Sequence, residues 1–389
     1  MKLRQVVFWS HLVAGVLAGL VILMMSVTGV LLTYERQIVD WVEQSFSAGP
    51  VNGRENLTAD ELVSVALLAA PDAQQVTLVY KNDPNAIMKV SAGRNNDFLV
   101  NPVSGEILHK GQTSTEAFFS KVMYIHRWFA LSGDSRATGR AITGYSNLLF
   151  LFILVSGVYL WLPRVWKWAI IKTKIFLNPR AKSGKARDFN WHHVIAFWSV
   201  IPLFILVSTA SVFYFPWASN LVYAAFGEDP PERRRGSAST EQLPTAEIHK
   251  SNAELLLLAK NELETRGLTD WETISMQAVT DTGAPASFRV DRSIGGQPAK
   301  VVNLKLDSID GSVTSWRTFA ESSPGSRARS NIRFLHTGEV FGFAGQTIAG
   351  LASLAACFLV WTGLALAWRR LIQSLFRNRH VRTTLADAT

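Results

Sequence analysis

The chain has 389 residues, of which 48% are hydrophobic and only 18% are charged. The apolar residues gather in four long blocks that contain no acidic or basic side chain, whereas a soluble core would spread them periodically. These blocks are 6–34, 141–163, 189–227 and 340–368. About 20 helical residues cross a bilayer, so we expect an all-α membrane core of four transmembrane helices at 6–34, 141–163, 189–216 and 340–368. The first block lacks a small-residue cleavage site, so we expect a retained anchor.

Basic residues cluster beside the apolar blocks and set the expected orientation. Eight Lys or Arg and no acid lie between Arg164 and Arg187, two precede the first block, and five follow the last. These segments also contain two acids, Asp188 and Asp387, so their own net charge is +13. The whole chain has a formal net charge of +9, which leaves about −4 for the rest. Basic residues favour the cytoplasmic side, so both termini, the loop 164–188 and the tail 369–389 are expected there. The isoelectric point of 9.7 is therefore explained by basic segments that fix the topology and contact anionic lipid of the partner bilayer. No nucleic-acid partner is indicated.

Two long segments, 36–140 and 217–339, are expected on the outer, periplasmic face. Both are too long for structureless loops, and each contains a capping-box helix start, at Thr58 to Glu61 and at Ser251 to Glu254. Alternating stretches typical of strands follow, at 76–80, 87–90, 99–108, 274–279, 288–290 and 301–306. We therefore expect two periplasmic α+β domains, each a helix followed by an antiparallel sheet.

The apolar blocks carry matching residues, which indicate a duplicated 2+2 arrangement. His11 and His192 are each followed, 17 residues later, by a threonine and a small residue, at Thr28-Gly29 and Thr209-Ala210. The second and fourth blocks end alike, with Ser156-Gly157 and Thr362-Gly363. A unit of helix, outer domain and helix that occurs twice predicts this pattern. A duplicated membrane protein could also be a transporter, so that alternative stays open.

Four of the eight histidines fall at membrane depth, where an ionisable residue is a functional hypothesis. His11 and His192 lie just inside the cytoplasmic ends of their spans, and His126 and His336 precede the outer starts of spans two and four. Neutral imidazole binds haem iron, and two facing histidines can fill both axial positions. We therefore expect two sites for haem b, one near each membrane face.

Simpler explanations of these residues exist. A single interfacial histidine often only hydrogen-bonds, and glycines four residues apart are typical of helix packing. His193 could replace His192 as a ligand, although the register of the repeat favours His192. The other three histidines lie in loops or the tail, where a solvated role is expected: His109, His249 and His380.

Other redox cofactors are excluded by the motifs that the chain lacks. Its one cysteine, Cys357, allows no internal disulfide, no covalent haem attachment and no self-contained iron–sulfur cluster. No dinucleotide or Walker fingerprint occurs. Reducing equivalents must therefore come from an electron donor elsewhere, either a quinol or a cytoplasmic reductase.

The pattern of these motifs resembles the PepSY-associated transmembrane family over nearly the whole chain. The matching stretches are His11-x3-Gly15, Ser26-Val-Thr-Gly29, Ile125-His-Arg127 with Gly139-Arg140, Trp191-His-x3-Ala-x-Trp198 and Leu335-His-Thr-Gly338-x3-Gly342. The two Asn/Asp-x-x-x-Gly hairpins after capped helices are similar to its PepSY-like outer domains. Two positions depart from the pattern: Ala196, where glycine is usual, and Gln346, where arginine often follows a glycine.

The resemblance implies a bacterial inner-membrane haem protein that reduces ferric siderophores on the periplasmic side. It implies that haem iron is held by His11, His126, His192 and His336. The proposed reaction is transfer of electrons from the cytoplasmic side through two bis-histidine haems to Fe(III)-siderophore, with release of Fe(II). The catalytic residues that touch the substrate are not identified by the pattern.

Several outer residues could assist this reaction. Arg127, Arg140 and Arg333 lie near the outer histidines and could pair with haem propionates. Arg327, Arg329 and Trp128 are weaker candidates for the substrate face, and interfacial anchoring would explain all six equally well. Two rival functions remain: a siderophore or iron permease, or its partner protein, without a redox centre, and a PepSY-type module that binds or inhibits an outer protein.

Overall fold

The computed structural model describes residues 3–46, 55–83, 85–93, 96–231, 249–279 and 284–386, with side chains up to residue 371 in the last range. The chain forms two compact units. We call Met1–Thr33, Ser120–Leu221 and Ile332–Thr389 the bundle unit, and Tyr34–Phe119 and Val222–Asn331 the sheet unit.

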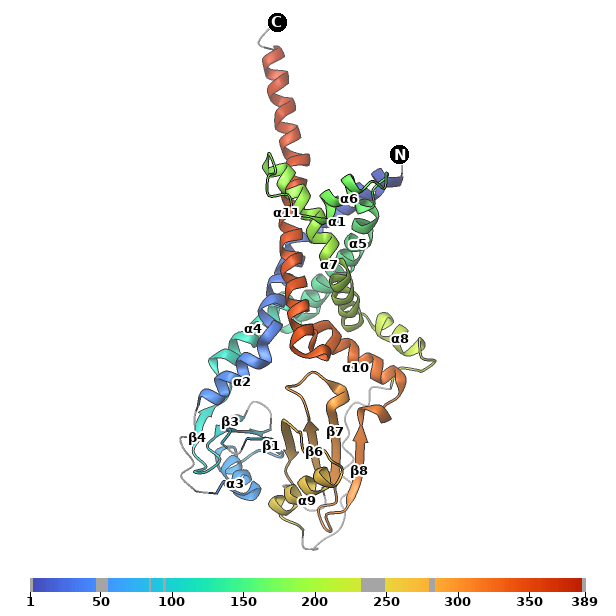
Figure 1. Cartoon of the computed structure of the whole chain (residues 1–389). Coiled ribbons are helices and arrows are strands. Elements are labelled where there is room, and N and C mark those ends of the chain that lie inside the picture. Colours follow the sequence, from blue (N-terminus) through green and yellow to red (C-terminus); the bar gives the residue numbers. More distant parts are fainter. Residues whose placement is uncertain are drawn as a thin grey trace. The chain divides into compact units, whose positions relative to one another are not determined.

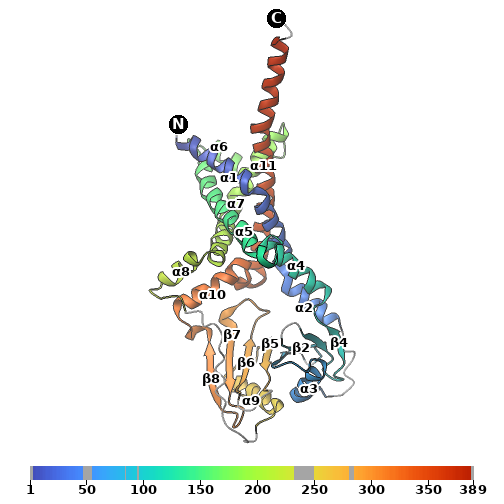
Figure 2. The ribbon, with the colours of Figure 1, turned by 180° about the vertical axis from the view of Figure 1, so that it is seen from behind.

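The bundle unit is built from four long helices, as the sequence predicts (Figures 1 and 2). They are α1 (Leu3–Leu31), α5 (Arg136–Trp161), α7 (Gly184–Tyr214) and α11 (Gly342–Ala386). Each contains a stretch long and apolar enough to cross a membrane. Helix α1 packs against α5 and α11, and α7 packs against the same two helices, so the four form a closed ring. Of the shorter helices, α6 (Trp168–Ile175) belongs to this unit and α2 (Glu35–Ser45) belongs to the sheet unit, whereas the residues of α4 (Ser114–Trp128), α8 (Pro216–Ala224) and α10 (Pro324–Thr337) are divided between the two.

Small and hydroxyl side chains fill the interior of the bundle, and large apolar ones cover its outside. Ala18 and Ala356 are 1% exposed, whereas Leu17 and Ile201 are more than 70% exposed. Lipid tails are as apolar as leucine, so membrane helices associate through close packing of small residues and through polar contacts. This distribution is the one expected for a multi-pass membrane protein.

Short turns connect α4 to α5 and α10 to α11. In the first, a Cβ on Gly139 would overlap the main-chain carbonyl of Trp128. In the second, a Cβ on Gly345 would overlap the carbonyl of Gly338, which has a φ of +76°. Glycine is required at such close approaches of backbone to backbone. Each turn thereby fixes the end of the helix that carries His126 or His336.

The sheet unit contains one antiparallel sheet of eight strands in the order β4-β3-β2-β1-β5-β6-β7-β8. The strands are β1 (Val76–Lys81), β2 (Met88–Ala92), β3 (Asp97–Val100), β4 (Ile107–Lys110), β5 (Thr273–Gln277), β6 (Ala286–Asp291), β7 (Val301–Leu306) and β8 (Val313–Thr318). Our expectation of two separate domains differs from this arrangement, because β1 pairs with β5 from Thr77–Gln277 to Lys81–Thr273. The pairing satisfies backbone groups that would otherwise form two open edges.

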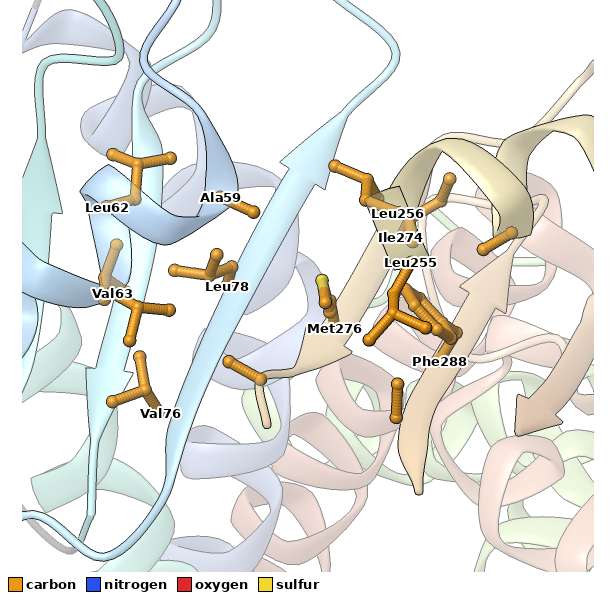
Figure 3. Close-up of a cluster of buried hydrophobic side chains, with 14 of the residues drawn as sticks. Ala59, Leu62, Val63, Val76, Leu78, Leu255, Leu256, Ile274, Met276 and Phe288 are labelled. Atoms are coloured by element: carbon orange, nitrogen blue, oxygen red, sulfur yellow. The ribbon is translucent and has the colours of Figure 1, made fainter. Parts of the chain in front are cut away.

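Helices α3 (Ala59–Ala69) and α9 (Asn252–Thr265) pack on the sheet and share one apolar core, part of which Figure 3 shows. Both predicted capping boxes are present, at Thr58 with Glu61 and at Ser251 with Glu254. The N–H group of Thr58 donates to the Glu61 carboxylate, which lowers the pKa of that carboxyl. Residues that are at most 2% exposed in this core include Leu62, Val76, Leu78, Leu255, Ile274, Met276, Phe288 and Leu304.

The two predicted Asn/Asp-x-x-x-Gly hairpins have the same hydrogen-bond pattern. The Asn101 side-chain oxygen accepts from the N–H groups two and three residues later, and the Asp307 carboxylate does the same. Each turn ends on a glycine with positive φ, Gly105 at +72° and Gly311 at +80°. This agreement supports the alignment of the two outer segments.

Candidate functional site

Two histidines near one end of the bundle each contact a hydroxyl on a neighbouring helix. His11 Nδ1 on α1 lies 2.9 Å from Ser156 Oγ on α5. His192 Nδ1 on α7 lies 2.9 Å from Thr362 Oγ1 on α11. His192 and His11 are also close enough to interact electrostatically. We call these two residues the His11–His192 pair.

The other two histidines repeat this contact. His126 Nδ1 on α4 lies 2.8 Å from Thr28 Oγ1 on α1. His336 Nδ1 on α10 lies 3.1 Å from Thr209 Oγ1 on α7. His126 and His336 also interact electrostatically, and we call them the His126–His336 pair.

The hydrogen bonds of the hydroxyl groups fix the tautomer of all four imidazoles. Each hydroxyl donates to the carbonyl four residues earlier in its own helix at 2.7 Å, so its oxygen is left to accept from the histidine. The main-chain carbonyl three residues before that hydroxyl residue also lies near each imidazole. For His336 the distance from Nδ1 to the Leu206 oxygen is 2.9 Å. A carbonyl can only accept, so Nδ1 carries the hydrogen and Nε2 keeps its lone pair.

A small residue follows each hydroxyl and makes room for the ring. A Cβ on Gly157 would lie 3.3 Å from His11 Cε1, and one on Gly363 would lie 3.4 Å from His192 Cε1. In the other pair, a Cβ on Gly29 would lie 3.8 Å from Cε1 of His126. A Cβ at Gly157 would press on the imidazole of His11, and one at Gly363 would touch that of His192. The fourth hydroxyl is followed by alanine, at position 210.

The two pairs lie toward opposite ends of the bundle. His11 and Thr28, which belong to different pairs, are 17 residues apart on α1, and His192 and Thr209 are 17 apart on α7. A helix rises 1.5 Å per residue, so the pairs are separated by about 25 Å along the helix axes. This length is close to the hydrocarbon thickness of a bilayer.

The remaining histidines lack this arrangement. His193 Nδ1 lies 2.8 Å from the carbonyl of Phe189 in its own helix, and its ring packs on that of Phe189. His109 Nε2 contacts the carbonyl of Gln112, and His249 Nδ1 contacts Ser308 Oγ. The side chain of His380 lies outside the described residues. The cross-helix contact therefore favours His192 over His193 as the ligand.

Of the predicted arginines, Arg140 is anchored to the end of α7. Its guanidinium donates to the carbonyls of Phe213 at 2.9 Å and Tyr214 at 3.2 Å. The last carbonyls of a helix have no partner within the helix and carry partial negative charge. Arg140 thus joins α5 to α7 beside the His126–His336 pair.

Four guanidinium groups gather near this end of the bundle. Arg127 and Arg136 lie 4.6 Å and 4.0 Å from the ring centroid of Trp128. Burial, together with the charges of Arg140, Arg333 and Arg136, lowers the pKa of Arg127. Within the described part of the chain, none of Arg127, Arg140 and Arg333 pairs with a carboxylate. Several guanidinium groups that lie close together without a carboxylate partner suit an anionic group such as a propionate.

The weaker candidates are placed less closely together. Trp128 lies between Arg127 and Arg136, whereas Arg327 and Arg329 belong to the sheet unit. Gln346, one departure from the family pattern, donates to the Thr33 carbonyl at 3.1 Å and joins α11 to the end of α1. The other departure, Ala196, is half-buried on α7.

Our sequence reasoning did not identify the hydroxyl partners of the four histidines. Ser156, Thr362, Thr28 and Thr209 are part of the repeat that the sequence displays, but we interpreted them only as a sign of duplication. The signal that could have found them is the recurrence of a hydroxyl residue before glycine or alanine once in each span. A buried imidazole ligand needs an acceptor for its other nitrogen.

Neither pair is a self-contained metal site. Over the residues that the structure describes, no group of three or more His, Cys, Asp or Glu side chains could hold a metal ion. Two imidazoles supply two donors, so further donors would have to come from a ligand such as a porphyrin.

Comparison with known proteins agrees with the four spans and the resemblance of the motifs. The chain matches the model of the PepSY-associated TM region over residues 8–370, which is nearly its whole length. No curated protein matches it. The chain therefore belongs to the PepSY-associated transmembrane family.

Proposed function

We propose that the chain is a dihaem b-type electron-transfer protein that reduces Fe(III)-siderophores and releases Fe(II). The observation that carries this proposal is the set of four histidines whose Nδ1–H groups are fixed by hydroxyls and carbonyls. Such bonds orient a metal-binding imidazole and raise its basicity. Each histidine is thereby prepared to bind iron through Nε2.

The donor set fits haem b. The two histidines of each pair come from different helices, and each would supply one Nε2 to hold the iron. The lone Cys357 cannot form the two covalent attachments of a c-type haem. Bound haem would supply a one-electron Fe(III)/Fe(II) couple at each pair. Arg127, Arg140 and Arg333 would neutralise the propionates at the His126–His336 pair.

The positions of the two pairs suggest a route across the membrane. They are about 25 Å apart along the helices, so two centres could connect the two faces of a bilayer. The basic segments beside His11 and His192 favour the cytoplasmic side for that pair. We propose a bacterial inner-membrane protein with both termini in the cytoplasm and the sheet unit in the periplasm. Electrons would enter from a quinol or a cytoplasmic reductase.

The chemistry of the substrate explains why reduction would release iron. Siderophores hold Fe(III) through hard oxygen donors, and Fe(II), with its lower charge, binds such donors less tightly. The arginine-rich end beside His126 and His336 offers positive charge to an anionic ferric complex.

Within the described residues, the bundle presents the same histidine contact in both halves, which supports an origin by duplication.

Haem content is the first test. The purified chain from haem-replete cells should contain about two extractable haems, with low-spin spectra that change on reduction. The reduced protein should then be reoxidised by a ferric siderophore, and a chelator should trap Fe(II). A correctly folded but colourless protein would refute the proposal and favour a permease or a PepSY-type binding module.

A further inference from the structure

A cavity of about 420 Å³ lies within the sheet unit, apart from the histidine pairs. It is bounded by the start of α3, the end of β1, the start of β2 and one face of α9. Its walls include Met88, Leu256 and Trp271, together with Tyr80 and Lys260. Ligand pockets of drug-sized molecules have volumes in this range, and this cavity mixes its apolar walls with polar residues such as Asn56, Asn82 and Asp83.

Lys260 brings a partly desolvated positive charge to the cavity. Its Nζ lies 5.7 Å from the ring centroid of Tyr80 and 5.9 Å from that of Trp271. Burial lowers the pKa of this ammonium group. Over the described residues Lys260 pairs with no carboxylate, whereas Lys81, also in the wall, pairs with Asp40. A cation held among aromatic rings without a counter-ion favours binding of an anion.

Tyr80 adds an unused hydrogen-bond donor. Its phenol oxygen is buried and has no hydrogen-bond partner among the described residues. Burial raises the pKa of Tyr80, so the phenol keeps its hydrogen. The nearby Asp60 carboxylate is already engaged, because it accepts from Asn252 and from the Ala253 N–H group. A buried donor without a partner costs free energy that a ligand acceptor would recover.

One acidic residue also lies at the cavity. Asp83 Oδ1 accepts the N–H group of Asn85 at 2.9 Å, in the loop that follows β1. This hydrogen bond engages the Asp83 carboxylate within its own loop. Among the described residues, Asp83 forms no ion pair with Lys260.

We propose that this cavity binds a small organic anion: a carboxylate carried on an aromatic or branched apolar body. Lys260 pairs with the carboxylate, Tyr80 donates to it, and Trp271 packs on the apolar body. Walls come from α3 and β1 in the first outer segment and from α9 in the second. The ligand would therefore stabilise the β1–β5 seam, where the two segments join. This inference does not depend on haem binding.

Two probes with the same body test the role of charge. The full-length chain in detergent is titrated calorimetrically with 2-naphthoate and with neutral 2-naphthalenemethanol. Hydrogen bonds to a charged group are stronger than those between neutral groups, so 2-naphthoate should bind at least about tenfold more tightly than the alcohol. Equal affinity of the two probes overturns the proposal, because micelles and apolar walls would then explain binding.

Variants locate the site. Lys260→Met keeps the apolar stem and should weaken 2-naphthoate binding at least about tenfold, while Lys260→Arg should retain it. The matched control is Lys305→Met, which removes an exposed lysine of β7 outside the cavity and should change nothing. Tyr80→Phe should weaken binding by a smaller factor. Unchanged affinity in Lys260→Met overturns the site, and binding of a peptide carboxyl terminus but not of 2-naphthoate overturns the ligand class.

Discussion

The bundle unit and the sheet unit bury polar side chains for different purposes. In the sheet unit, the buried polar residues Asn101 and Asn252 begin a turn and a helix at the margin of a large apolar core. In the bundle unit, Thr28, Thr209 and Thr362 lie within long helices and contact histidines on other helices. The sheet unit uses burial for stability. The bundle unit places polar side chains where they orient histidines, which suits the proposed haem sites.

The largest effect is expected from removing one imidazole of the bundle. His192→Ala should remove one of the two haems and leave the spectrum of the His126–His336 site, because the pairs are about 25 Å apart. Haem per chain and reduced-minus-oxidised spectra measure this loss. The neighbouring change His193→Ala should keep both haems, since His193 bonds only its own helix. If the two variants behave the other way round, His193 is the ligand.

The next effect concerns the core of the sheet unit. Phe288 is 2% exposed, and its replacement by alanine should destabilise that unit by about 3–5 kcal/mol. Denaturant-dependent proteolysis of the sheet unit measures the change, and haem content should remain near two per chain. Arg289→Ala, at the exposed neighbouring position of β6, should have little effect. Loss of haem in Phe288→Ala at low denaturant would contradict the division of roles between the units.

A smaller effect should follow from removal of one hydroxyl. Thr362→Val keeps the shape of the side chain but takes away the oxygen that accepts from His192. Partners of this kind affect metal affinity by about 10- to 100-fold, so haem should leave the His11–His192 site faster when apomyoglobin is added as a haem scavenger. Ser199→Ala is the control, because Ser199 makes the same bond to a carbonyl of its helix but contacts no histidine. Equal rates in both variants would show that the hydroxyls only pack.

Much of this architecture could be predicted from the sequence, because its signals are local. Uninterrupted apolar blocks gave the four spans, and both capping boxes and both glycine turns occur where the pattern indicates. The pairing of β1 with β5 could not be predicted in this way. An edge strand has the same alternation whether it ends a sheet or pairs with a partner almost 200 residues away.

The histidines of the site could be predicted, but their partners could not. Membrane depth alone makes His11 and His336 conspicuous. That His11 meets Ser156, and His336 meets Thr209, depends on the rotation and crossing of the helices. Hydroxyl residues in membrane helices also bond their own backbone or pack against neighbours. A serine or threonine before glycine or alanine therefore had more than one explanation.

The smallest effect is expected at the turn between α4 and α5 of the bundle unit. Phe129 and Ala130 both have positive φ, at +54° and +57°. This conformation costs about 1–2 kcal/mol for an L-residue, and glycine relieves it while losing about 0.5–1 kcal/mol in backbone entropy. Ala130→Gly should therefore raise the stability of the bundle by up to about 1 kcal/mol.

The measurement for Ala130→Gly is the thermal midpoint of haem loss at the His126–His336 site. Ala137→Gly provides the control, because Ala137 is an exposed residue in regular helix α5, where glycine should lower stability by about 1 kcal/mol. The same substitution should thus act with opposite signs seven residues apart. If both variants lower the midpoint, other contacts of the turn outweigh the left-handed backbone at position 130, and the strain does not set how firmly His126 is held.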